Sequence, residues 1–355
     1  MTADHPRIAL LTPHPFGGYR GGTEVFNGLL QRALGDVEVF ADPEGLESAR
    51  KGPLTRVGLS EPYGAMGVAR AFLRHHRVNP FQLAICNGLY GWPLTFGHLG
   101  IPLVEVYHFT MAGLARQALP LRGDRFTTGT VAAFFDGLAG RGKFVVAVSD
   151  SVRREVRDYY GFRGQVIPNA VDPAFFRRRD RQQARERLGL PDQSPIGLFV
   201  GRPEYAKGFD VFLEVARSRP DITFVVLGTG TATEQNVRML GDVPHAEMPL
   251  FYSASDFLFL PSRYEGFSLI VLEAAACELP LVVSRAAYNL AANPSDLGFV
   301  AESLRPEEFQ KGIQLVLDQR STFSPREAIA DMYAYERFRQ SWNGLVTTLL
   351  QKTQG

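Results

Sequence analysis

The segment 261-PSRYEGFSLIVLEAAACELPLVVS-284 places two glutamates, Glu265 and Glu273, eight positions apart around a small-residue step. The apolar run before it, 256-DFLFL-260, predicts a buried strand. After Ser268 the apolar residues recur at helical spacing, and 280-PLVVS-284 predicts another strand. One carboxylate therefore stands just before a helix and the other stands within it.

The rest of the chain repeats this alternation of strands and helices. Amphipathic stretches such as 23–34 and 209–219 separate short apolar runs, as in parallel sheets covered by helices on both faces. The fold class is therefore α/β. The predicted strands are 7–13, 37–41, 82–86, 102–107, 144–149, 165–168, 196–200, 222–228, 256–262 and 280–284.

A chain of 355 residues is too long for one ordinary core, so two domains are expected. The charge-dense stretch 172–195 interrupts the strand series, which restarts after it, and the boundary is predicted near residue 170. Residues 1–170 form the predicted first domain and 171–334 the second. A final helix, 335–355, has no strand after it.

The composition favours a soluble globular protein over a membrane-spanning or nucleic-acid-binding one. A hydrophobic content of 45% and a charged content of 21% are those of a soluble globular protein, and no apolar run reaches the ~18 residues that span a bilayer. Residues 1–15 predict a first strand rather than a signal peptide. Cys86 and Cys277 lie in separate apolar segments, which favours reduced thiols in the cytoplasm. A net charge of +1 argues against a nucleic-acid partner.

Three predicted strand ends carry residues suited to an anionic ligand. A glycine-rich stretch, 15-PFGGYRGGTEVF-26, precedes a helix, where backbone can approach a ligand closely. The stretch 201-GRPEYAKG-208 follows the strand 196–200 and contains Arg202 and Lys207. The third is the opening segment. Open α/β sheets bind ligands outside the carboxyl ends of their strands, so these three loops are the candidate site.

The opening segment itself predicts a sugar nucleotide. The step Gly266-Phe267-Ser268 presents amides of a helix N-terminus, which suit a diphosphate. Helical side chains tilt toward the N-terminus, so Glu273 can accept hydrogen bonds from a vicinal diol such as ribose. Glu265 faces the other side of the phosphates, where a second polyhydroxylated group fits.

With these residues in place, the chain resembles a retaining glycosyltransferase of the GT-B fold, similar to family 4, over nearly its whole length. The most specific element is Glu265-GFSLIVL-Glu273 with GRPEYAKG about sixty residues earlier. GGTEV, VYHF, VSDSVRREV, VIPNAVD and MPLFYSASDFLFLPS support it in this order. The resemblance implies two Rossmann-like domains that face a cleft, with the final helix crossing back to the first domain.

The resemblance also implies roles on the donor side. Arg202 and Lys207 match the basic pair that holds the donor diphosphate, and amides from Phe267 to Leu269 share that load. Glu273 matches the ribose-binding glutamate. Glu265 matches the glutamate beside the transferred sugar.

In the first domain, His108 matches a histidine that contacts the donor sugar, and Gly22 matches the glycine loop over the donor. Departures from the family pattern put donor identity in doubt. Phe109 stands where many relatives have Asp, and Arg285-Ala286-Ala287-Tyr288 replaces a glycine-containing turn. Glu278-Leu279 replaces the small residue usual before a strand proline.

No metal and no cofactor are expected. The seven histidines show no ligand spacing and no Asp-x-Asp occurs, so fixed cations and amides would stabilise the leaving diphosphate. The predicted co-substrate is a UDP- or GDP-sugar. The predicted acceptor is a hydroxyl of a small molecule, a glycan or a lipid-linked compound, and retention rests on the resemblance alone.

Alternatives remain at this stage. A regulatory subunit that binds a nucleotide sugar without turnover, or a sugar-nucleotide epimerase, would share many of these motifs. Gly228-Thr229-Gly230 is too short a fingerprint to indicate a nicotinamide enzyme. Residues 69–78 form a basic amphipathic helix, so weak peripheral contact with the inner membrane face is a hypothesis. The alternative is an apolar stripe packed on the sheet.

Overall fold

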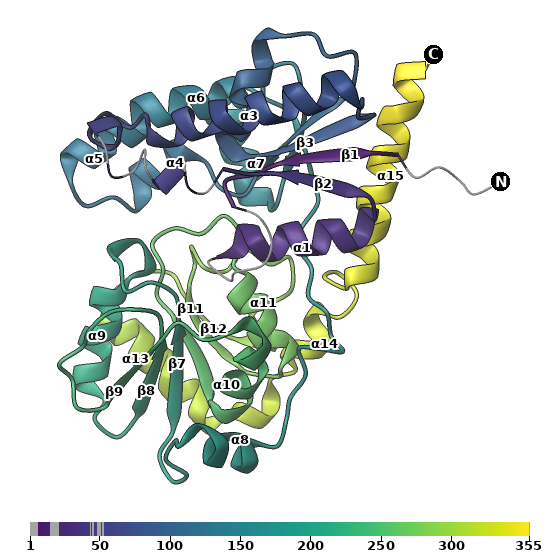
Figure 1. The fold of residues 1–355 in the computed structure, drawn as a ribbon. Coiled ribbons are helices and arrows are strands. Elements are labelled where there is room, and N and C mark those ends of the chain that lie inside the picture. The colour runs from purple at the N-terminus through teal and green to yellow at the C-terminus, as the bar shows by residue number, and fades with distance from the viewer. Residues whose placement is uncertain are drawn as a thin grey trace. The chain divides into compact units, whose positions relative to one another are not determined.

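The computed structural model describes residues 6–14, 21–42, 44, 46–47, 51 and 53–354. The chain divides into two compact units, each with its own parallel sheet. Unit 1 consists of residues 1–169 and 338–355, and unit 2 consists of residues 170–337 (Figure 1).

The sheet of unit 1 has the strand order β2-β1-β3-β4-β5-β6, and every neighbouring pair is parallel. Its central strands are largely apolar because parallel sheets are covered on both faces, with Asn87 and Glu105 as buried polar exceptions. The strands are β1 (Ile8–Leu11), β2 (Val37–Phe40), β3 (Leu83–Asn87), β4 (Leu103–Tyr107), β5 (Phe144–Ala147) and β6 (Gly164–Val166).

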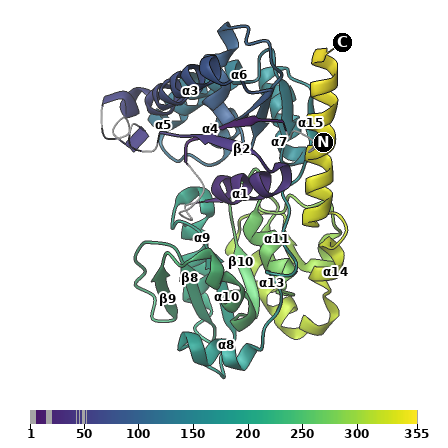
Figure 2. The ribbon, with the colours of Figure 1, turned by 45° about the vertical axis from the view of Figure 1, so that its right-hand side comes forward.

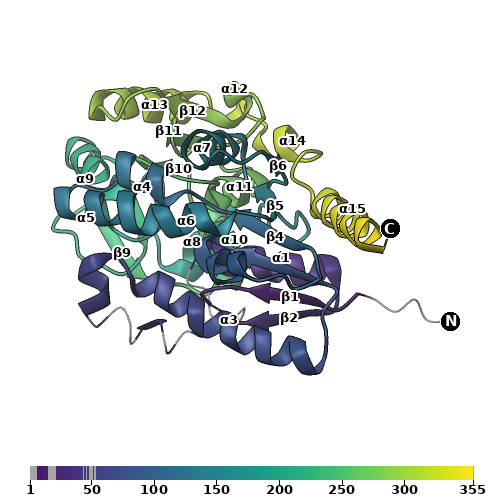
Figure 3. The same ribbon diagram turned by 90° about the horizontal axis from the view of Figure 1, so that it is seen from above.

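Helices cover both faces of this sheet. Helices α1 and α3 lie on opposite sides of β1 and β2 (Figures 1 and 3). The helices are α1 (Gly22–Leu34), α3 (Ser60–Val78), α4 (Met111–Gln117), α5 (Arg122–Thr127), α6 (Ala133–Ala139) and α7 (Asp150–Tyr160). Shorter helical segments are η1 (Pro53–Val57), η2 (Gly88–Phe96) and η3 (Thr128–Ala132).

The C-terminal helix α15 (Tyr335–Gln354) packs on unit 1 (Figure 2). The rings of Phe338 and Trp342 lie 6.0 and 5.9 Å from that of Phe26 on α1, and Asn343 donates to the carbonyl of Ala33 at 2.9 Å. Trp342 is fully buried. The last helix is therefore part of the core of the first unit.

The sheet of unit 2 has the order β12-β11-β10-β7-β8-β9, again with parallel neighbours. All ten strands predicted from the sequence are present, whereas the two edge strands β9 and β12 were not predicted. The strands are β7 (Ile196–Val200), β8 (Thr223–Leu227), β9 (Val237–Gly241), β10 (Phe257–Leu260), β11 (Leu281–Ser284) and β12 (Gly298–Ala301).

Helices of unit 2 also lie on both faces of its sheet (Figure 1). Helices α9 and α13 pack together over one face, while α8, α10 and α11 are neighbours over the other. The helices are α8 (Arg181–Leu188), α9 (Phe209–Ser218), α10 (Met248–Ala254), α11 (Leu269–Ala276), α12 (Pro294–Leu297), α13 (Pro306–Asp318) and α14 (Pro325–Ile329). Shorter helical segments are η4 (Tyr205–Lys207), η5 (His245–Glu247) and η6 (Arg320–Thr322).

The amphipathic segment 69–78 lies within α3, and its apolar stripe faces the core. Ala69 and Phe72 are buried, and the Phe72 ring stacks on His76 at 5.4 Å. The apolar stripe therefore packs in the core of unit 1, and contact of the basic residues with a membrane stays a hypothesis. In the part of the chain that the structure describes, no helix has the length and apolar character needed to span a bilayer.

Candidate active site

The sheet of unit 2 changes its direction of growth between β7 and β10. From β7 the chain adds β8 and β9 on one side, and β10, β11 and β12 then extend the other side. Ligands of open α/β sheets bind outside the carboxyl ends of the strands at such a switch point. The loops there, 201–208 and 261–268, are two of the three predicted from sequence.

A cation and a carboxylate meet at this switch point. Lys207 Nζ donates to Glu265 Oε1 at 2.7 Å, and Ser262 Oγ donates to the same oxygen at 2.9 Å. Gly208 has a φ of 68°, and a Cβ there would lie 1.9 Å from the carbonyl oxygen of Pro261. Glycine is required because the two loops approach this closely.

Arg202 lies on the same loop but does not join this cluster. Its side chain is 77% exposed and pairs with Glu204 at 3.1 Å. Lys207, in contrast, is only 29% exposed. The structure therefore brings Lys207, and not Arg202, into contact with Glu265.

Helix α11 begins at Leu269, with Ser268 as its N-cap. Ser268 Oγ accepts from the amide of Val271 at 3.4 Å, so the cap satisfies one N–H of the first turn. Gly266 and Phe267 form the turn before the helix, and the Phe267 ring lies 5.8 Å from that of Tyr333. The first amides of α11 carry the partial positive charge of a helix N-terminus.

Glu273 is buried in α11 and already has two partners. Tyr252 donates its hydroxyl to Oε2 at 2.7 Å, and His245 Nε2 lies 2.8 Å from Oε1. A carboxylate oxygen has two lone pairs, so each oxygen keeps capacity for one further donor. Neither partner could be predicted from the sequence, because Tyr252 and His245 lie 21 and 28 positions away on other elements and no motif spacing links them to Glu273.

His245 is held between Glu273 and an aromatic pair. Its ring lies 5.3 Å from Phe176 and 6.1 Å from Phe175. Burial lowers the pKa of His245, but the hydrogen bond to Glu273 and the charge of that carboxylate together outweigh burial and leave the pKa raised. This arrangement orients the carboxylate of Glu273.

In unit 1, His108 follows β4, is half-buried, and contacts a buried polar network. Its Nε2 lies 3.1 Å from Asn87 Oδ1, and its ring meets the edge of Phe26 at 4.6 Å. Burial lowers the pKa of His108 to about 4, so the imidazole is neutral at pH 7. Asn87 stands at the end of β3, next to β4 in the sheet.

Gly22 is the first residue of α1, the helix that follows β1 in the chain. The glycine-rich stretch that precedes it, residues 15–20, lies outside the described residues. The predicted role of this loop over the donor therefore stays a prediction.

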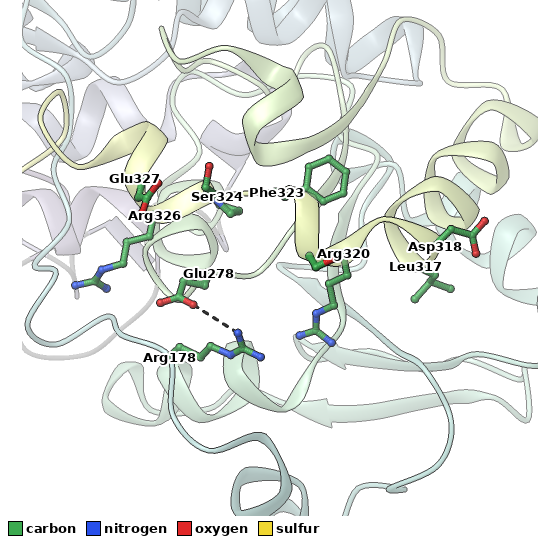
Figure 4. Close-up of a pocket in the computed structure, with 11 residues that line it drawn as sticks. Arg178, Glu278, Leu317, Asp318, Arg320, Phe323, Ser324, Arg326 and Glu327 are labelled. Atoms are coloured by element: carbon green, nitrogen blue, oxygen red, sulfur yellow. Dashed lines mark ion pairs between the residues drawn. The ribbon is translucent and has the colours of Figure 1, made fainter.

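A separate cavity of about 660 Å³ lies beside α13 and α14 (Figure 4). Its arginines already have partners: Arg178 pairs with Glu278 at 3.5 Å, Arg320 binds Asp256, and Arg326 donates to three backbone carbonyls. These contacts tie the segment after residue 170 to α14. The cavity contains none of the residues predicted from sequence for the donor.

Comparison with known proteins establishes the family. Residues 27–175 match Glycosyltransferase Family 4 and residues 180–337 match Glycosyl transferases group 1. A D-inositol 3-phosphate glycosyltransferase of Kineococcus radiotolerans is 30% identical over 340 residues, covering 78% of this chain and 77% of that protein. The chain belongs to the family 4 glycosyltransferases.

The predicted family and fold are thereby confirmed. A sucrose-phosphate synthase from Thermosynechococcus elongatus has a TM-score of 0.80 at 19% identity, covering 98% of this chain and 100% of that one. Anabaena HepE in complex with UDP and glucose has a TM-score of 0.73 at 17% identity, covering 97% and 100%. At these identities the similarity shows the GT-B fold alone.

Other family 4 relatives are longer than this chain. A D-inositol 3-phosphate glycosyltransferase of Segniliparus rotundus is 30% identical over 261 residues. The match covers 65% of this chain and 56% of that protein, so the chain spans little more than half of that relative.

The positions that depart from the family pattern lie in both units. The ring of Tyr288 is buried and its hydroxyl donates to the carbonyl of Ala292 at 2.7 Å. Asn289 instead donates to the carbonyl of Glu265 at 2.8 Å and so supports that loop. Phe109 is 38% exposed. Glu278 adopts a φ of 59°, a conformation that favours glycine.

Proposed function

We propose that this chain transfers a sugar from a nucleotide-diphosphate sugar to a hydroxyl acceptor, with retention at the anomeric carbon and without a metal ion. The observation that supports it most strongly is the contact of Lys207 with Glu265 at the switch point, beside the start of α11. Phosphate-binding and sugar-binding chemistry are adjacent there, as a sugar nucleotide requires.

Lys207 and the first amides of α11 hold the diphosphate in this account, and Arg202 reaches it from the solvent side. Glu273 accepts hydrogen bonds from the ribose hydroxyls through the lone pairs that Tyr252 and His245 leave. Without donor, Lys207 is neutralised by Glu265. A phosphate oxygen competes for Lys207, and Glu265 is then released to accept hydrogen bonds from the sugar.

The chemistry follows from where charge develops. When the bond between the anomeric carbon and the phosphate oxygen breaks, negative charge grows on the diphosphate, and fixed donors aimed at it stabilise the transition state. Within the described residues there is no group of three or more His, Cys, Asp or Glu that could hold a metal ion. In this proposal Lys207, Arg202 and the helix amides supply the positive charge. We propose retention on the resemblance to retaining family 4 enzymes. The route to retention that needs no covalent nucleophile is attack by the acceptor on the leaving-group face.

UDP is the first nucleotide to test, because several structural neighbours are complexes with UDP or UDP-glucose. GDP is the second. The names of the curated relatives make a cyclic polyol phosphate the first acceptor to assay, followed by glycans and lipid-linked alcohols. The two free, buried cysteines support a cytoplasmic protein, which is part of the same proposal.

The test is a panel of UDP-, GDP-, ADP- and TDP-sugars incubated with the protein in excess EDTA and followed by NMR. The proposal predicts release of a nucleoside diphosphate, slowly without acceptor and faster with one, and a product whose anomeric configuration matches the donor. An epimerised sugar nucleotide would identify an epimerase instead. Complete stability of every donor would favour a non-catalytic binding subunit, and activity restored only by Mg²⁺ or Mn²⁺ would refute metal independence.

A further inference from the structure

His108 is connected to a backbone carbonyl through three buried neutral side chains. Thr12, Asn27 and Asn87 lie after β1, in α1 and at the end of β3, and none is more than 3% exposed. Asn27 Nδ2 donates to the carbonyl of His14 at 3.3 Å and to Thr12 Oγ1 at 3.0 Å. Asn87 Nδ2 donates to Asn27 Oδ1 at 2.7 Å and to Thr12 Oγ1 at 3.3 Å.

This network determines the orientation of both amides. The carbonyl of His14 can only accept, so the NH₂ group of Asn27 must face it and Oδ1 of Asn27 must face Asn87. Asn87 therefore turns its own NH₂ group toward Asn27, and its Oδ1 toward His108. A flip of either amide would place two oxygens or two NH₂ groups against each other in a buried site, where an unmade hydrogen bond costs roughly 1–3 kcal/mol.

The same reasoning assigns the tautomer of His108. Oδ1 of Asn87 accepts, so Nε2 of His108 must carry the proton. The neutral ring then has its lone pair on Nδ1. Phe26 packs edge-on against the imidazole at 4.6 Å and restricts its rotation.

We propose that Asn87 is a positioning residue that fixes His108 as the neutral Nε2–H tautomer, so that Nδ1 is left to accept a hydrogen bond from a substrate hydroxyl. The use made of Nδ1 rests on the proposed function, whereas the tautomer itself does not. His108 is thus an acceptor for a neutral hydroxyl rather than a cation for the phosphates. Neutrality suits this role because an imidazolium has no lone pair left to accept with.

The direct test is long-range ¹H–¹⁵N correlation NMR on protein labelled with ¹⁵N-histidine at pH 7.5, with His108→Ala to assign the signals. We expect the Nε2–H pattern for His108 in the native protein. Asn87→Leu removes the acceptor and should give a tautomer mixture, while Asn79→Leu, the same change at an exposed position on the end of α3, should not. If the native spectrum shows the Nδ1–H tautomer or a charged ring, the inference is wrong.

Kinetics supply a second readout that a purely structural role would not move. We expect Asn87→Leu to lower kcat on the order of tenfold, the effect of losing one oriented hydrogen bond, with unchanged affinity for UDP or GDP. Unchanged kcat and tautomer in a folded Asn87→Leu variant would overturn the proposal. If that variant does not fold, Asn27→Ala perturbs the same orientation one step further from His108, and the native spectrum still decides the tautomer. Absence of turnover in the native protein would count against the proposed function only.

Discussion

Replacing Lys207 with methionine removes a charge at the switch point and keeps most of the side chain. A charge-assisted hydrogen bond contributes roughly 1.5–3 kcal/mol, and the 29% exposure of Lys207 places its effect at the lower end. We therefore expect about 1.5–2 kcal/mol of lost binding energy, a roughly 10- to 30-fold rise in Kd for UDP or GDP.

The fold should survive this substitution, because Glu265 keeps the hydrogen bond from Ser262 and is 11% exposed to water. Isothermal titration of UDP and GDP into both proteins measures the change. Lys311→Met is the matched control, since Lys311 is exposed on α13 of the same unit. Equal Kd values for native protein and Lys207→Met would refute the assignment of the diphosphate to this loop.

Glu265→Gln, at the same contact, should change the Kd for UDP or GDP in the opposite direction. Loss of the competing carboxylate frees Lys207 for phosphate, and for a partly exposed pair this is worth about 0.5–1 kcal/mol, a roughly two- to fivefold lower Kd. Sugar transfer should nevertheless slow, because Glu265 no longer accepts from the sugar. Weaker nucleotide binding in Glu265→Gln would show that the ion pair does not compete with the donor.

Three further predictions concern stability and can be followed by chemical denaturation. Asp256→Asn should destabilise unit 2 by about 3–5 kcal/mol, because Arg185, which is 1% exposed, loses its buried counter-charge at 2.7 Å; a loss below 1 kcal/mol would contradict this. Glu278→Gly should raise the free energy of unfolding by about 0.5–1 kcal/mol, because glycine adopts the positive φ of this position without strain and only an exposed ion pair with Arg178 is lost. Destabilisation would show that the ion pair contributes more than the backbone strain costs. Burial raises the pKa of Asp136 to about 7, so the folded state holds its proton more tightly than the unfolded state does. The free energy of unfolding should fall by roughly 4 kcal/mol in total between pH 4 and pH 7, and Asp136→Asn should flatten that fall; an identical pH profile would refute it.

The central strands could be predicted from the sequence because they are largely apolar runs. Strands β9 and β12 were missed because they lack such a run. Both are short edge strands, and in β9 exposed residues such as Arg238 alternate with half-buried ones. An edge strand buries less apolar surface, so its pattern is weak.

Some residues of the candidate site could be predicted from the sequence, and others could not. Lys207 and Glu265 were predicted from motifs at strand ends, and their contact follows from the adjacency of β7 and β10. The partners that orient the site, Asn87 for His108 and Tyr252 for Glu273, come from other elements. Such pairs depend on the register of the folded chain, which the spacing of residues along the sequence does not encode.

The most direct test of the account is hydrogen–deuterium exchange of the native protein with and without saturating UDP or GDP, in EDTA. The account predicts protection of segments 201–208 and 261–273 in unit 2 with the preferred nucleotide, and loss of that protection in Lys207→Met at the same concentration. Protection confined to other segments, or none with either nucleotide under conditions where donor is consumed, would contradict the placement of the donor at the switch point of unit 2.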